Sequence, residues 1–367
     1  MRITINCRSI LLSQRTGIGR YTYHLLENLG KIDQTDAYIL HVPKRLLDFK
    51  RRLPDFSRYH NFKNVIDCFH RGSGQSDIYH LPSPDEIGPY SGKLIVTIHD
   101  LIHKAYPQSH TPPTIELTER YMQVIAAKAD MIICISENTR RDLHSFLKIP
   151  PERSCVVYNG VDHQLFYPLS AQERLEAAEH FKGLGILKPY VLFVGTIEPR
   201  KNLDGLLKSF AQLKAQKVFG GQLVVAGMKG WMAEGIGDLI KQLNIQPDVI
   251  FTGYVTDEQL RRLYNGAEIF VFPSFYEGFG FPILEAFCCG AAVITSQSSS
   301  CAEIAGQAAI LIDPSDPNAM TRAMEKVLSD KAVKESLRQA GLKRAQEFSF
   351  EKMAQDTLAV YGRVAHL

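Results

Sequence analysis

The chain has 367 residues, more than one ordinary hydrophobic core accommodates and enough for two α/β domains. Hydrophobic residues make up 45% and charged residues 22%, as in globular proteins, and a formal net charge of +3 excludes a nucleic-acid binder defined by bulk charge. No apolar run approaches the roughly 20 residues of a membrane-spanning helix, and no signal-peptide core follows the N-terminus. The seven cysteines, an odd number without zinc-ligand spacing, indicate free thiols. We therefore expect a cytoplasmic protein.

Short apolar runs alternate with amphipathic segments from one end of the chain to the other. Continuous apolar runs separated by helical patterns are typical of doubly wound parallel sheets, so we predict an α/β protein with two Rossmann-like domains. The expected strands are Arg2–Asn6, Ile39–Val42, Leu94–Ile98, Met131–Ile135, Cys155–Val157, Tyr190–Val194, Gln222–Ala226, Val249–Phe251, Ile269–Phe272, Ala292–Thr295 and Ala309–Ile312. The helical patterns between them include Tyr21–Leu29, Thr114–Ala127, Asn202–Lys214 and Asp257–Asn265.

The alternation pauses over residues 167–189, which are polar and helix-like. We interpret this stretch as the connection between the two domains, which we place at 1–168 and 169–348. A terminal amphipathic helix over 349–367, with Ser349 as its N-cap, is expected to cross back to the first domain. Ligands of open α/β sheets bind at the carboxyl ends of the strands, so the chemistry is expected in the loops that follow strands.

The loop after the strand Ile269–Phe272 carries Glu277 and, eight residues later, Glu285. Gly280 permits a tight backbone path, and Pro282 suits the first turn of a helix. Such a loop presents backbone N–H groups to polar or anionic oxygens, and carboxylates accept hydrogen bonds from vicinal sugar hydroxyls. The same residues also fit a packed strand–turn–helix without a ligand.

A pair of cations follows the strand Tyr190–Val194. Gly195 lets the backbone turn there, and Arg200 and Lys201 come to the same sheet edge just before a helix. A guanidinium fork beside an ammonium group suits a diphosphate and would neutralise a nucleoside diphosphate as it leaves. The chain has no Asp-x-Asp sequence to support a divalent ion, so these charges are expected to replace a metal. A solvated basic pair is the alternative interpretation.

The first half of the chain offers weaker signals. Gly17 and Gly19 lie between the first strand and the first helix, but too far from that strand for a dinucleotide fingerprint. His99 stands at a strand's carboxyl end with Asp100 beside it, either as a cleft residue or as a satisfied structural histidine.

In this order, these residues resemble glycosyltransferase family 4, retaining enzymes of the GT-B fold. The resemblance covers nearly the whole chain, and the Glu277-to-Glu285 motif together with Gly195 to Asn202 is its most specific part. The other segments that carry it are Gly17-Ile18-Gly19, His99-Asp100, Asn159-Gly160-Val161-Asp162, Gly253-Tyr254-Val255 and Phe348-Ser349-Phe350-Glu351-Lys352.

The resemblance implies that the C-terminal domain holds a nucleotide-sugar donor. The matching residues are Arg200 and Lys201 for the diphosphate, Glu285 for the ribose, Val255 for the base, Glu277 with Phe279, Gly280 and Phe281 for the sugar, Gly17 and Gly19 near the phosphate, and His99 near the transferred sugar.

One position departs from the family pattern. Many members carry an Arg directly after the glycine of the phosphate-binding strand, and here that residue is Thr196. Arg200 is expected to supply the missing charge. The implied mechanism retains the anomeric configuration without an enzymic nucleophile: the leaving phosphate oxygen helps to deprotonate the acceptor on the same face of the sugar.

Within the family, the segment from Thr97 to Leu101 and the segment from Gly195 to Asn202 look most like bacterial mannosyltransferases of surface-polysaccharide and O-antigen synthesis. This implies GDP-mannose, ahead of a UDP-sugar, as donor, with no metal or other cofactor. It also implies a lipid-linked oligosaccharide acceptor at the cytoplasmic face of the inner membrane. The basic cluster that fits either anionic lipid or a solvated helix is Lys44, Arg45, Lys50, Arg51 and Arg52.

Other functions are compatible with the same predicted fold. A sugar-nucleotide epimerase would consume the donor without an acceptor, and a phosphorylase would usually need pyridoxal phosphate. A non-catalytic partner in polysaccharide assembly would bind a nucleotide sugar without turnover.

Overall fold

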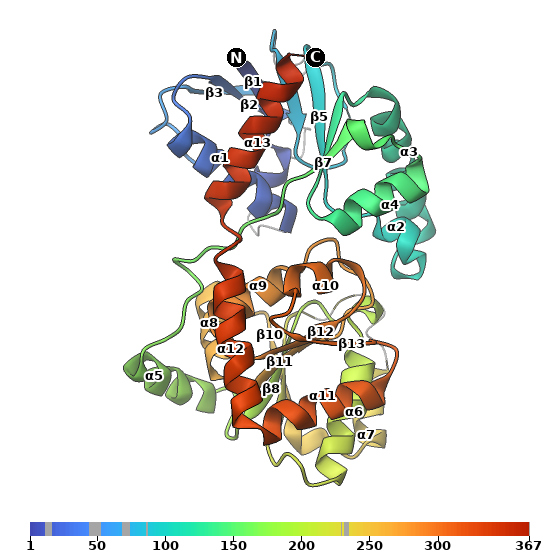
Figure 1. The fold of residues 1–367 in the computed structure, drawn as a ribbon, viewed down its shortest axis with the longest axis vertical. Helices are drawn as coiled ribbons and strands as arrows, with labels where there is room; N and C mark the ends of the chain where they lie inside the picture. The colour runs from blue at the N-terminus through green and yellow to red at the C-terminus, as the bar shows by residue number, and fades with distance from the viewer. Residues whose placement is uncertain are drawn as a thin grey trace. The chain divides into compact units, whose positions relative to one another are not determined.

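The computed structural model describes residues 1–11, 17–43, 53–67, 74–85, 87–228, 230 and 235–366. The chain forms two compact units, Met1–Gly160 with Ser349–Leu367, and Val161–Phe348 (Figure 1). The first division therefore falls at 160/161, whereas the sequence analysis placed it after 168. Hydrogen bonds to the second unit explain the difference, because Asn265 Nδ2 donates to the Tyr167 carbonyl at 3.0 Å and Arg261 Nη1 to the Leu165 carbonyl at 3.1 Å.

The first unit is built on a parallel sheet. In the described part of the chain this sheet has seven strands in the order β3-β2-β1-β4-β5-β6-β7. Its strands are β1 Arg2–Asn6, β2 Ala37–Pro43, β3 Phe62–Asp67, β4 Ile78–Leu81, β5 Lys93–Ile98, β6 Met131–Cys134 and β7 Ser154–Val156. Its helices are α1 Gly17–Ile32, α2 Ile102–Ala105, α3 Pro112–Lys128, α4 Glu137–Leu147 and α13 Phe350–Ala365, with short 3₁₀ turns at Arg8–Leu11, Pro107–Ser109 and Pro151–Arg153.

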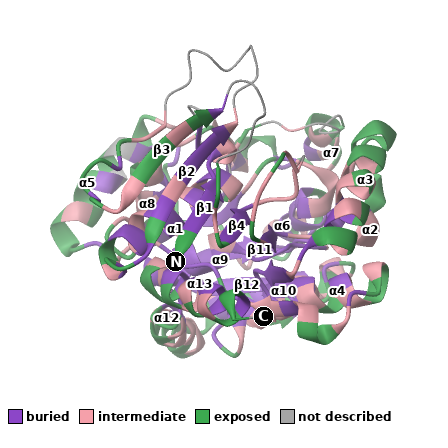
Figure 2. Ribbon diagram, turned by 90° about the horizontal axis from the view of Figure 1, so that it is seen from above, coloured by how far each residue is buried: buried purple, intermediate pink, exposed green. Residues whose placement is uncertain are grey.

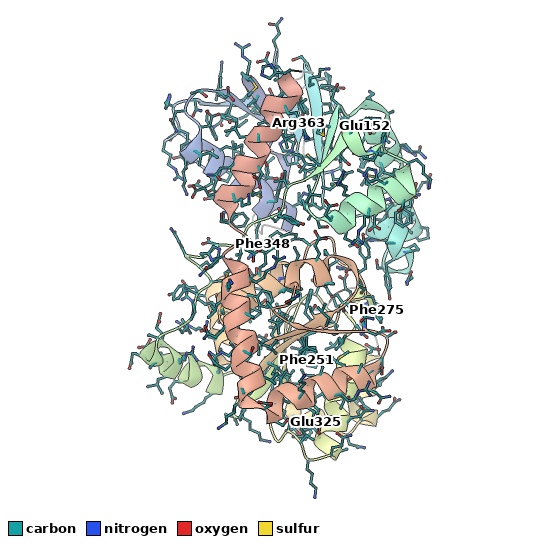
Figure 3. The ribbon with its side chains drawn as sticks, viewed as in Figure 1. Glu152, Phe251, Phe275, Glu325, Phe348 and Arg363 are labelled. Atoms are coloured by element: carbon teal, nitrogen blue, oxygen red, sulfur yellow. The ribbon has the colours of Figure 1, made fainter. Side chains whose placement is uncertain are left out.

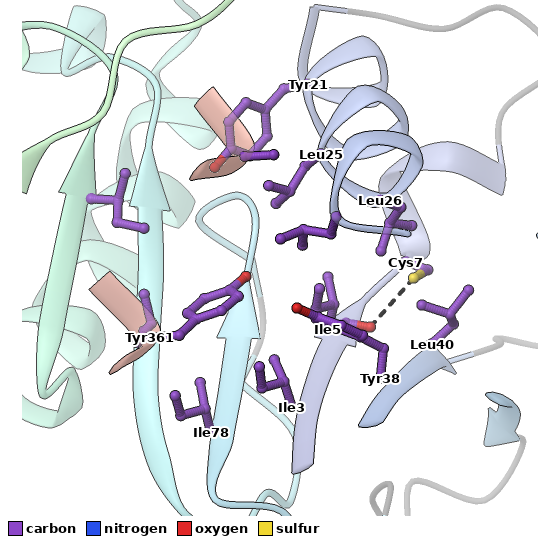
Figure 4. Close-up of a cluster of buried hydrophobic side chains, with 14 of the residues drawn as sticks. Ile3, Ile5, Cys7, Tyr21, Leu25, Leu26, Tyr38, Leu40, Ile78 and Tyr361 are labelled. Atoms are coloured by element: carbon purple, nitrogen blue, oxygen red, sulfur yellow. Dashed lines mark hydrogen bonds between the residues drawn. The ribbon is translucent and has the colours of Figure 1, made fainter. Parts of the chain in front are cut away.

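Helix α13 completes the core of the first unit. It lies beside α1 although more than three hundred residues separate them (Figure 1). Its Tyr361 is fully buried in the cluster that also contains Ile3, Ile5 and Leu25 (Figure 4). Val364 belongs to the same cluster and is also fully buried. Ser349 begins the helix as predicted, because its side chain accepts a hydrogen bond from the N–H of Lys352.

A chain of buried polar groups ties α13 to the sheet. His80 on β4 contacts Tyr361 Oη through Nδ1 at 2.6 Å and Thr97 Oγ1 through Nε2 at 2.9 Å. Thr97 in turn contacts Tyr21 Oη at 3.0 Å. Burial, with a smaller contribution from the nearby His99, lowers the pKa of His80 to about 3, so this imidazole is neutral.

The second unit is a second doubly wound sheet. Its six described strands are parallel, in the order β10-β9-β8-β11-β12-β13. They are β8 Tyr190–Val194, β9 Gln222–Ala226, β10 Val249–Gly253, β11 Ile269–Phe272, β12 Val293–Ser296 and β13 Ile310–Ile312. The helices are α5 Ala171–Lys182, α6 Leu203–Ala215, α7 Ile236–Gln242, α8 Asp257–Gly266, α9 Phe281–Cys288, α10 Ser299–Ala305, α11 Pro317–Ser329 and α12 Lys331–Ala345, with 3₁₀ turns at Pro199–Lys201 and Gln246–Asp248.

The predicted fold class is confirmed, and the predicted strands all appear, four of them with unchanged bounds. Two strands, β3 and β4, were missed. Strand β3 is an edge strand in which every residue but Asp67 is exposed or half-buried, in contrast to β1, which is buried after its first residue (Figure 2). Helix α1 begins at Gly17 rather than Tyr21, so Gly17 and Gly19 lie in its first turn and not in a loop.

Two further expectations concern the whole chain. The six described cysteines are free, and all but Cys155 are buried; Cys68 lies outside the described residues. None of the helices in the described part of the chain is both long enough and apolar enough to cross a membrane.

Candidate active site

The candidate site forms where the strand order of the second sheet reverses. Strands β8 and β11 are neighbours there, although β9 and β10 lie between them in sequence. The loops after these two strands meet at their carboxyl ends, because the N–H of Phe275 donates to the carbonyl of Arg200 at 2.9 Å. Phe275 is labelled on its loop in Figure 3. Such a reversal point is where open α/β sheets bind ligands.

Glycines let the strand ends approach closely. Gly195 (φ +148°) turns the chain after β8. A Cβ atom added to Gly195 would lie 3.7 Å from the side chain of Lys201. Gly227 (φ +147°) follows β9, and a Cβ there would lie 2.1 Å from the carbonyl oxygen of Gly195. Both positions need glycine for their backbone angles, and Gly227 needs it also for space.

Lys201 is buried by its position on a 3₁₀ turn. The turn ends at Asn202, which adopts the left-handed conformation and caps α6 by accepting a hydrogen bond from the N–H of Gly205. The Lys201 ammonium lies 4.8 Å from the centre of the Phe272 ring on β11. The lysine is therefore held between the two strands of the reversal point.

The predicted cations and the first predicted carboxylate form one ion-pair network. Glu277 Oε1 lies 2.5 Å from Lys201 Nζ, and Glu277 Oε2 lies 2.8 Å from Arg200 Nη1. Burial disfavours the charged carboxylate, but the charges of Lys201 and Arg200 outweigh burial and lower the pKa of Glu277 to about 2. Glu277 is thus an ionised, buried carboxylate, not the solvated group of the structural alternative.

Arg200 is held by a residue that the sequence analysis did not single out. Glu198 Oε1 lies 2.5 Å from Arg200 Nη2, and the Tyr276 carbonyl accepts from Arg200 Nη1 at 2.7 Å. Thr196, at the position where the family carries Arg, is exposed. The only signal for Glu198 was its place, two residues before Arg200 in the same strand-end loop.

Three consecutive serines fix the Glu277 loop, and these were also missed. The N–H of Glu277 donates to Ser299 Oγ at 3.1 Å, and Ser300 Oγ donates to the Glu277 carbonyl at 2.8 Å. Ser298 Oγ donates to the Phe275 carbonyl at 3.1 Å. A run of serines at the start of a helix is a capping signal, but its use as a clamp on a distant loop appears only in three dimensions.

Helix α9 carries the second predicted carboxylate. Gly280 (φ +118°) begins the helix, and Pro282 lies in its first turn, as expected. Glu285 is buried and accepts a hydrogen bond from Tyr264 Oη at 3.1 Å. Phe279 is also buried, with its ring 5.2 Å from that of the half-buried Phe281.

Val255 is half-buried between the turn at Gly253 and the start of α8. Thr256, its neighbour, caps that helix in a capping box with Gln259. In the second unit the structure therefore joins Arg200, Lys201 and Glu277 in direct contact. Glu285 lies on α9, which contacts α8, and Val255 lies in the loop that precedes α8.

The N-terminal candidates lie in the first unit. His99 follows β5, is buried, and donates from Nε2 to the Pro82 carbonyl at 2.8 Å, which leaves Nδ1 as the acceptor nitrogen. Burial lowers the pKa of His99, although the Pro82 carbonyl and Asp100 act in the opposite direction. The Asp100 carboxylate accepts from the N–H of Ile102.

Two expectations need separate mention. Across the described residues, no group of three or more His, Cys, Asp and Glu side chains is arranged to hold a metal ion. The predicted basic cluster, from Lys44 to Arg52, lies outside the described residues.

Two doubly wound sheets, each in its own compact unit, make up the GT-B architecture of glycosyltransferases. Residues 15–165 match the family model described as Glycosyltransferase Family 4, and residues 177–344 match the model described as Glycosyl transferases group 1. The chain belongs to this family of GT-B glycosyltransferases and is an enzyme of that class.

Relatives and solved structures agree with this assignment. The chain is 28% identical to the O-antigen chain mannosyltransferase B of Escherichia coli, over 94% of this chain and 96% of that protein. It is 30% identical to the serotype-specific mannosyltransferase WbdA of Escherichia coli over 81% of this chain, but spans only 36% of that protein. The sucrose-phosphate synthase of Thermosynechococcus elongatus has the same fold, with a TM-score of 0.75, 21% identity and coverage of 99% and 98% of the two chains.

Proposed function

We propose that the chain transfers a mannosyl group from GDP-mannose to a hydroxyl of a lipid-linked glycan in surface-polysaccharide synthesis, with retention at the anomeric carbon. The observation that carries the proposal is the buried network of Lys201, Glu277 and Arg200 at the reversal point of the second sheet. Mannose is the first choice because the two Escherichia coli relatives are named as mannosyltransferases.

The network supplies both kinds of group that a nucleotide sugar needs. Lys201 and Arg200 are the donors for the diphosphate, and both are paired with Glu277 in the structure. When the donor binds, the phosphate oxygens replace Glu277 as the acceptors of hydrogen bonds from the two cations. The Glu277 carboxylate in turn accepts hydrogen bonds from vicinal hydroxyls of the sugar.

The remaining donor contacts are assigned from the family resemblance. Glu285 accepts from the ribose, and the backbone at Val255 contacts the base. Phe279, Gly280 and Phe281 contact the sugar through the backbone where α9 begins, while Gly17 and Gly19, in the first turn of α1, contact the phosphate. His99 takes a hydrogen bond from a sugar hydroxyl at Nδ1, because Nε2 is committed to Pro82.

The reaction breaks the bond between the anomeric carbon and the diphosphate oxygen. Positive charge on Lys201 and Arg200 stabilises the oxygen as it leaves, so no divalent cation is required in this proposal. The same oxygen accepts the proton of the acceptor hydroxyl, whose oxygen bonds to the anomeric carbon on the face that the leaving group occupied. The products are the nucleoside diphosphate and a glycan one sugar longer.

The acceptor is proposed to be an oligosaccharide on a lipid carrier. Such a substrate would bring the enzyme to the cytoplasmic face of the inner membrane as a peripheral protein. The basic cluster from Lys44 to Arg52 is the segment whose charge suits that contact.

The test is a binding panel of GDP, GDP-mannose, UDP and UDP-glucose by calorimetry, followed by turnover with a lipid-linked glycan. We expect GDP and GDP-mannose to bind, and NMR of the product to show the α configuration of the donor. Binding of the UDP compounds alone would overturn the mannose assignment and keep the transferase. An inverted product would overturn retention.

Two outcomes of the panel would point to other activities. Conversion of the nucleotide sugar without an acceptor would indicate an epimerase. Binding with no turnover on any acceptor tried, against a parallel reaction with an active relative, would indicate a non-catalytic assembly partner.

A further inference from the structure

A second cavity lies at the other end of the second sheet. Its volume is about 490 Å³. Pro189 and Tyr190 line it where β8 begins, and Ala267 and Glu268 line it directly before β11. The candidate active site follows the carboxyl ends of the same two strands. This second cavity, which we call the basal cavity, therefore lies at the amino ends of the strands and shares no residue with the active-site network.

The walls of the basal cavity carry an excess of positive charge. One carboxylate, Glu268, lines it together with six cations, which are Arg174, Lys182, Lys188, Arg262, Lys334 and Arg338.

Four of these cations have a carboxylate partner. Their ion pairs are Lys182 with Glu179, Lys188 with Asp248, Lys334 with Glu268 and Arg338 with Glu335.

The two remaining arginines are not neutralised. Within the described residues, neither Arg174 nor Arg262 lies within 4.0 Å of a carboxylate. Arg174 donates its Nε to the Leu169 carbonyl at 3.0 Å, which orients the guanidinium and leaves its other N–H groups for a ligand. Two positive charges thus remain at the wall of one cavity.

The floor of the basal cavity is apolar, and hydrogen bonds fix the residues that form it. Phe181 packs its ring edge-on to Tyr190 at 6.2 Å, and Ile186 lies beside them on the lining. Tyr190 Oη donates to the Leu263 carbonyl at 2.8 Å, and Asn265 Oδ1 accepts from the N–H of Leu169 at 2.7 Å. The cavity therefore offers a fixed apolar surface next to the two arginines.

We propose that the basal cavity is a second ligand site, which binds a phosphate monoester or diester carried on an apolar body. Guanidinium groups match phosphate oxygens in geometry, and the two uncompensated charges match a dianionic monoester. The apolar floor takes up the body of the ligand, since burial of apolar surface favours binding. A lipid headgroup and a soluble phosphate ester share this chemistry.

The test uses hexyl phosphate as the probe and the full chain. Calorimetry should show that hexyl phosphate binds at least ten times more tightly than inorganic phosphate. The double variant Arg174→Gln/Arg262→Gln should lose at least tenfold in affinity. Arg322→Gln, which changes an exposed arginine on α11 outside the cavity, should bind like the unchanged protein.

A further variant separates the basal cavity from the donor site. Lys201→Ala removes an active-site cation, and hexyl phosphate should bind this variant normally. Equal binding by the unchanged protein and the Arg174/Arg262 variant would overturn the proposal, as would a loss in Lys201→Ala alone. Equal affinity for hexyl phosphate and inorganic phosphate would contradict the proposal that the ligand carries an apolar body.

A second experiment distinguishes a lipid headgroup from a soluble phosphate ester as the ligand. The protein is sedimented with vesicles of phosphatidylglycerol and with vesicles of phosphatidylcholine. Binding to phosphatidylglycerol that the Arg174/Arg262 variant loses indicates a lipid headgroup. Binding of hexyl phosphate that the variant loses, with vesicle binding that is absent or that the variant keeps through the cluster from Lys44 to Arg52, indicates a soluble ester. Both results support the site, and neither depends on the identity of the donor sugar.

Discussion

Lys201 Nζ lies 2.5 Å from Glu277 Oε1, although 76 positions separate the two residues in the chain. The contact joins the loops that follow β8 and β11, and both side chains are buried. It joins the carboxylate that we propose to recognise the sugar and the cation that we propose to bind the diphosphate in one ion-pair network. A change to either partner is therefore expected to affect both donor binding and stability.

Replacement of Lys201 by Ala should weaken the binding of the nucleoside diphosphate at least tenfold. The reason is the loss of a charge-assisted hydrogen bond in a buried site, which contributes about 1.5–3 kcal/mol. Calorimetric titration with GDP measures the effect. Lys208→Ala, an exposed lysine on α6, is the control and should bind normally. Unchanged affinity in Lys201→Ala would remove the diphosphate assignment.

Replacement of Glu277 by Gln should destabilise the protein by about 3 kcal/mol at pH 7. The pKa of this carboxyl falls from 4.5 to about 2 on folding, and each unit corresponds to about 1.4 kcal/mol. Because the folded pKa is the lower one, the contribution is complete above pH 4.5 and is lost as the pH falls towards 2. Urea unfolding at pH 7, 5, 4 and 3.5 should show the gap between the two proteins narrowing only below about pH 4.5.

The control for that series is Glu258→Gln on α8, whose side chain is exposed. Its stability should follow that of the unchanged protein at every pH. A gap for Glu277→Gln that stays constant down to pH 3.5 would contradict the ion-pair explanation.

His80 should make the protein less stable in mild acid. The pKa of its imidazole is about 3 in the folded protein and 6.5 in the unfolded chain. Below pH 6.5 the unfolded chain therefore binds a proton at this residue that the native protein does not bind. Stability is then lost at about 1.4 kcal/mol per pH unit between 6.5 and 3. Urea unfolding of His80→Gln should show a slope shallower by that amount, whereas His60→Gln, at an exposed position, should keep the original slope.

Replacement of Gly227 by Ala should cost about 3 kcal/mol, because the residue combines φ +147° with a Cβ position 2.1 Å from the Gly195 carbonyl oxygen. Thermal unfolding measures the loss, and GDP binding should weaken as the Gly195 loop moves. Gly237→Ala is the matched control, because this glycine lies in α7 and no atom of the described residues outside its own helix backbone lies within 4 Å of its Cβ position. That variant should gain about 0.5 to 1 kcal/mol.

Activity with the nucleotide-sugar donor should survive an excess of EDTA. The proposal assigns the neutralisation of the leaving diphosphate to Lys201 and Arg200, which a chelator leaves in place. Initial rates before and after dialysis against EDTA measure this. A loss of activity that Mg²⁺ or Mn²⁺ restores would show that the two side chains do not suffice.

The sequence predicted the elements that are uniformly apolar. Strands such as Tyr190–Val194 and Ile269–Phe272 are buried on both faces, so their ends coincide with changes in composition. The edge strand Phe62–Asp67 is exposed or half-buried in every residue but Asp67 and carries no such signal. Ile78–Leu81 is buried, but His80 interrupts its apolar run. The boundary between the two units at 160/161 reflects hydrogen bonds from α8 to the segment that follows, which no local pattern reveals.

The candidate site was predicted as a set of residues but not as a network. Their place after two strands and the family resemblance selected Arg200, Lys201 and Glu277, yet nothing in the sequence indicates that the carboxylate neutralises the two cations. Such pairing depends on the order of β8 and β11 in the sheet. The clamp by Ser298, Ser299 and Ser300 likewise comes from a third strand-end loop, and only the fold brings it to Glu277.

Helix α13 has a consequence for how the protein is made. The first unit takes Tyr361 and Val364 into its core, so the whole of the second unit must be synthesised before that core can close. The second unit, by contrast, is one continuous segment, and its core needs no residue of α13. The core of the first unit is therefore completed by a helix that is made only after the whole of the second unit.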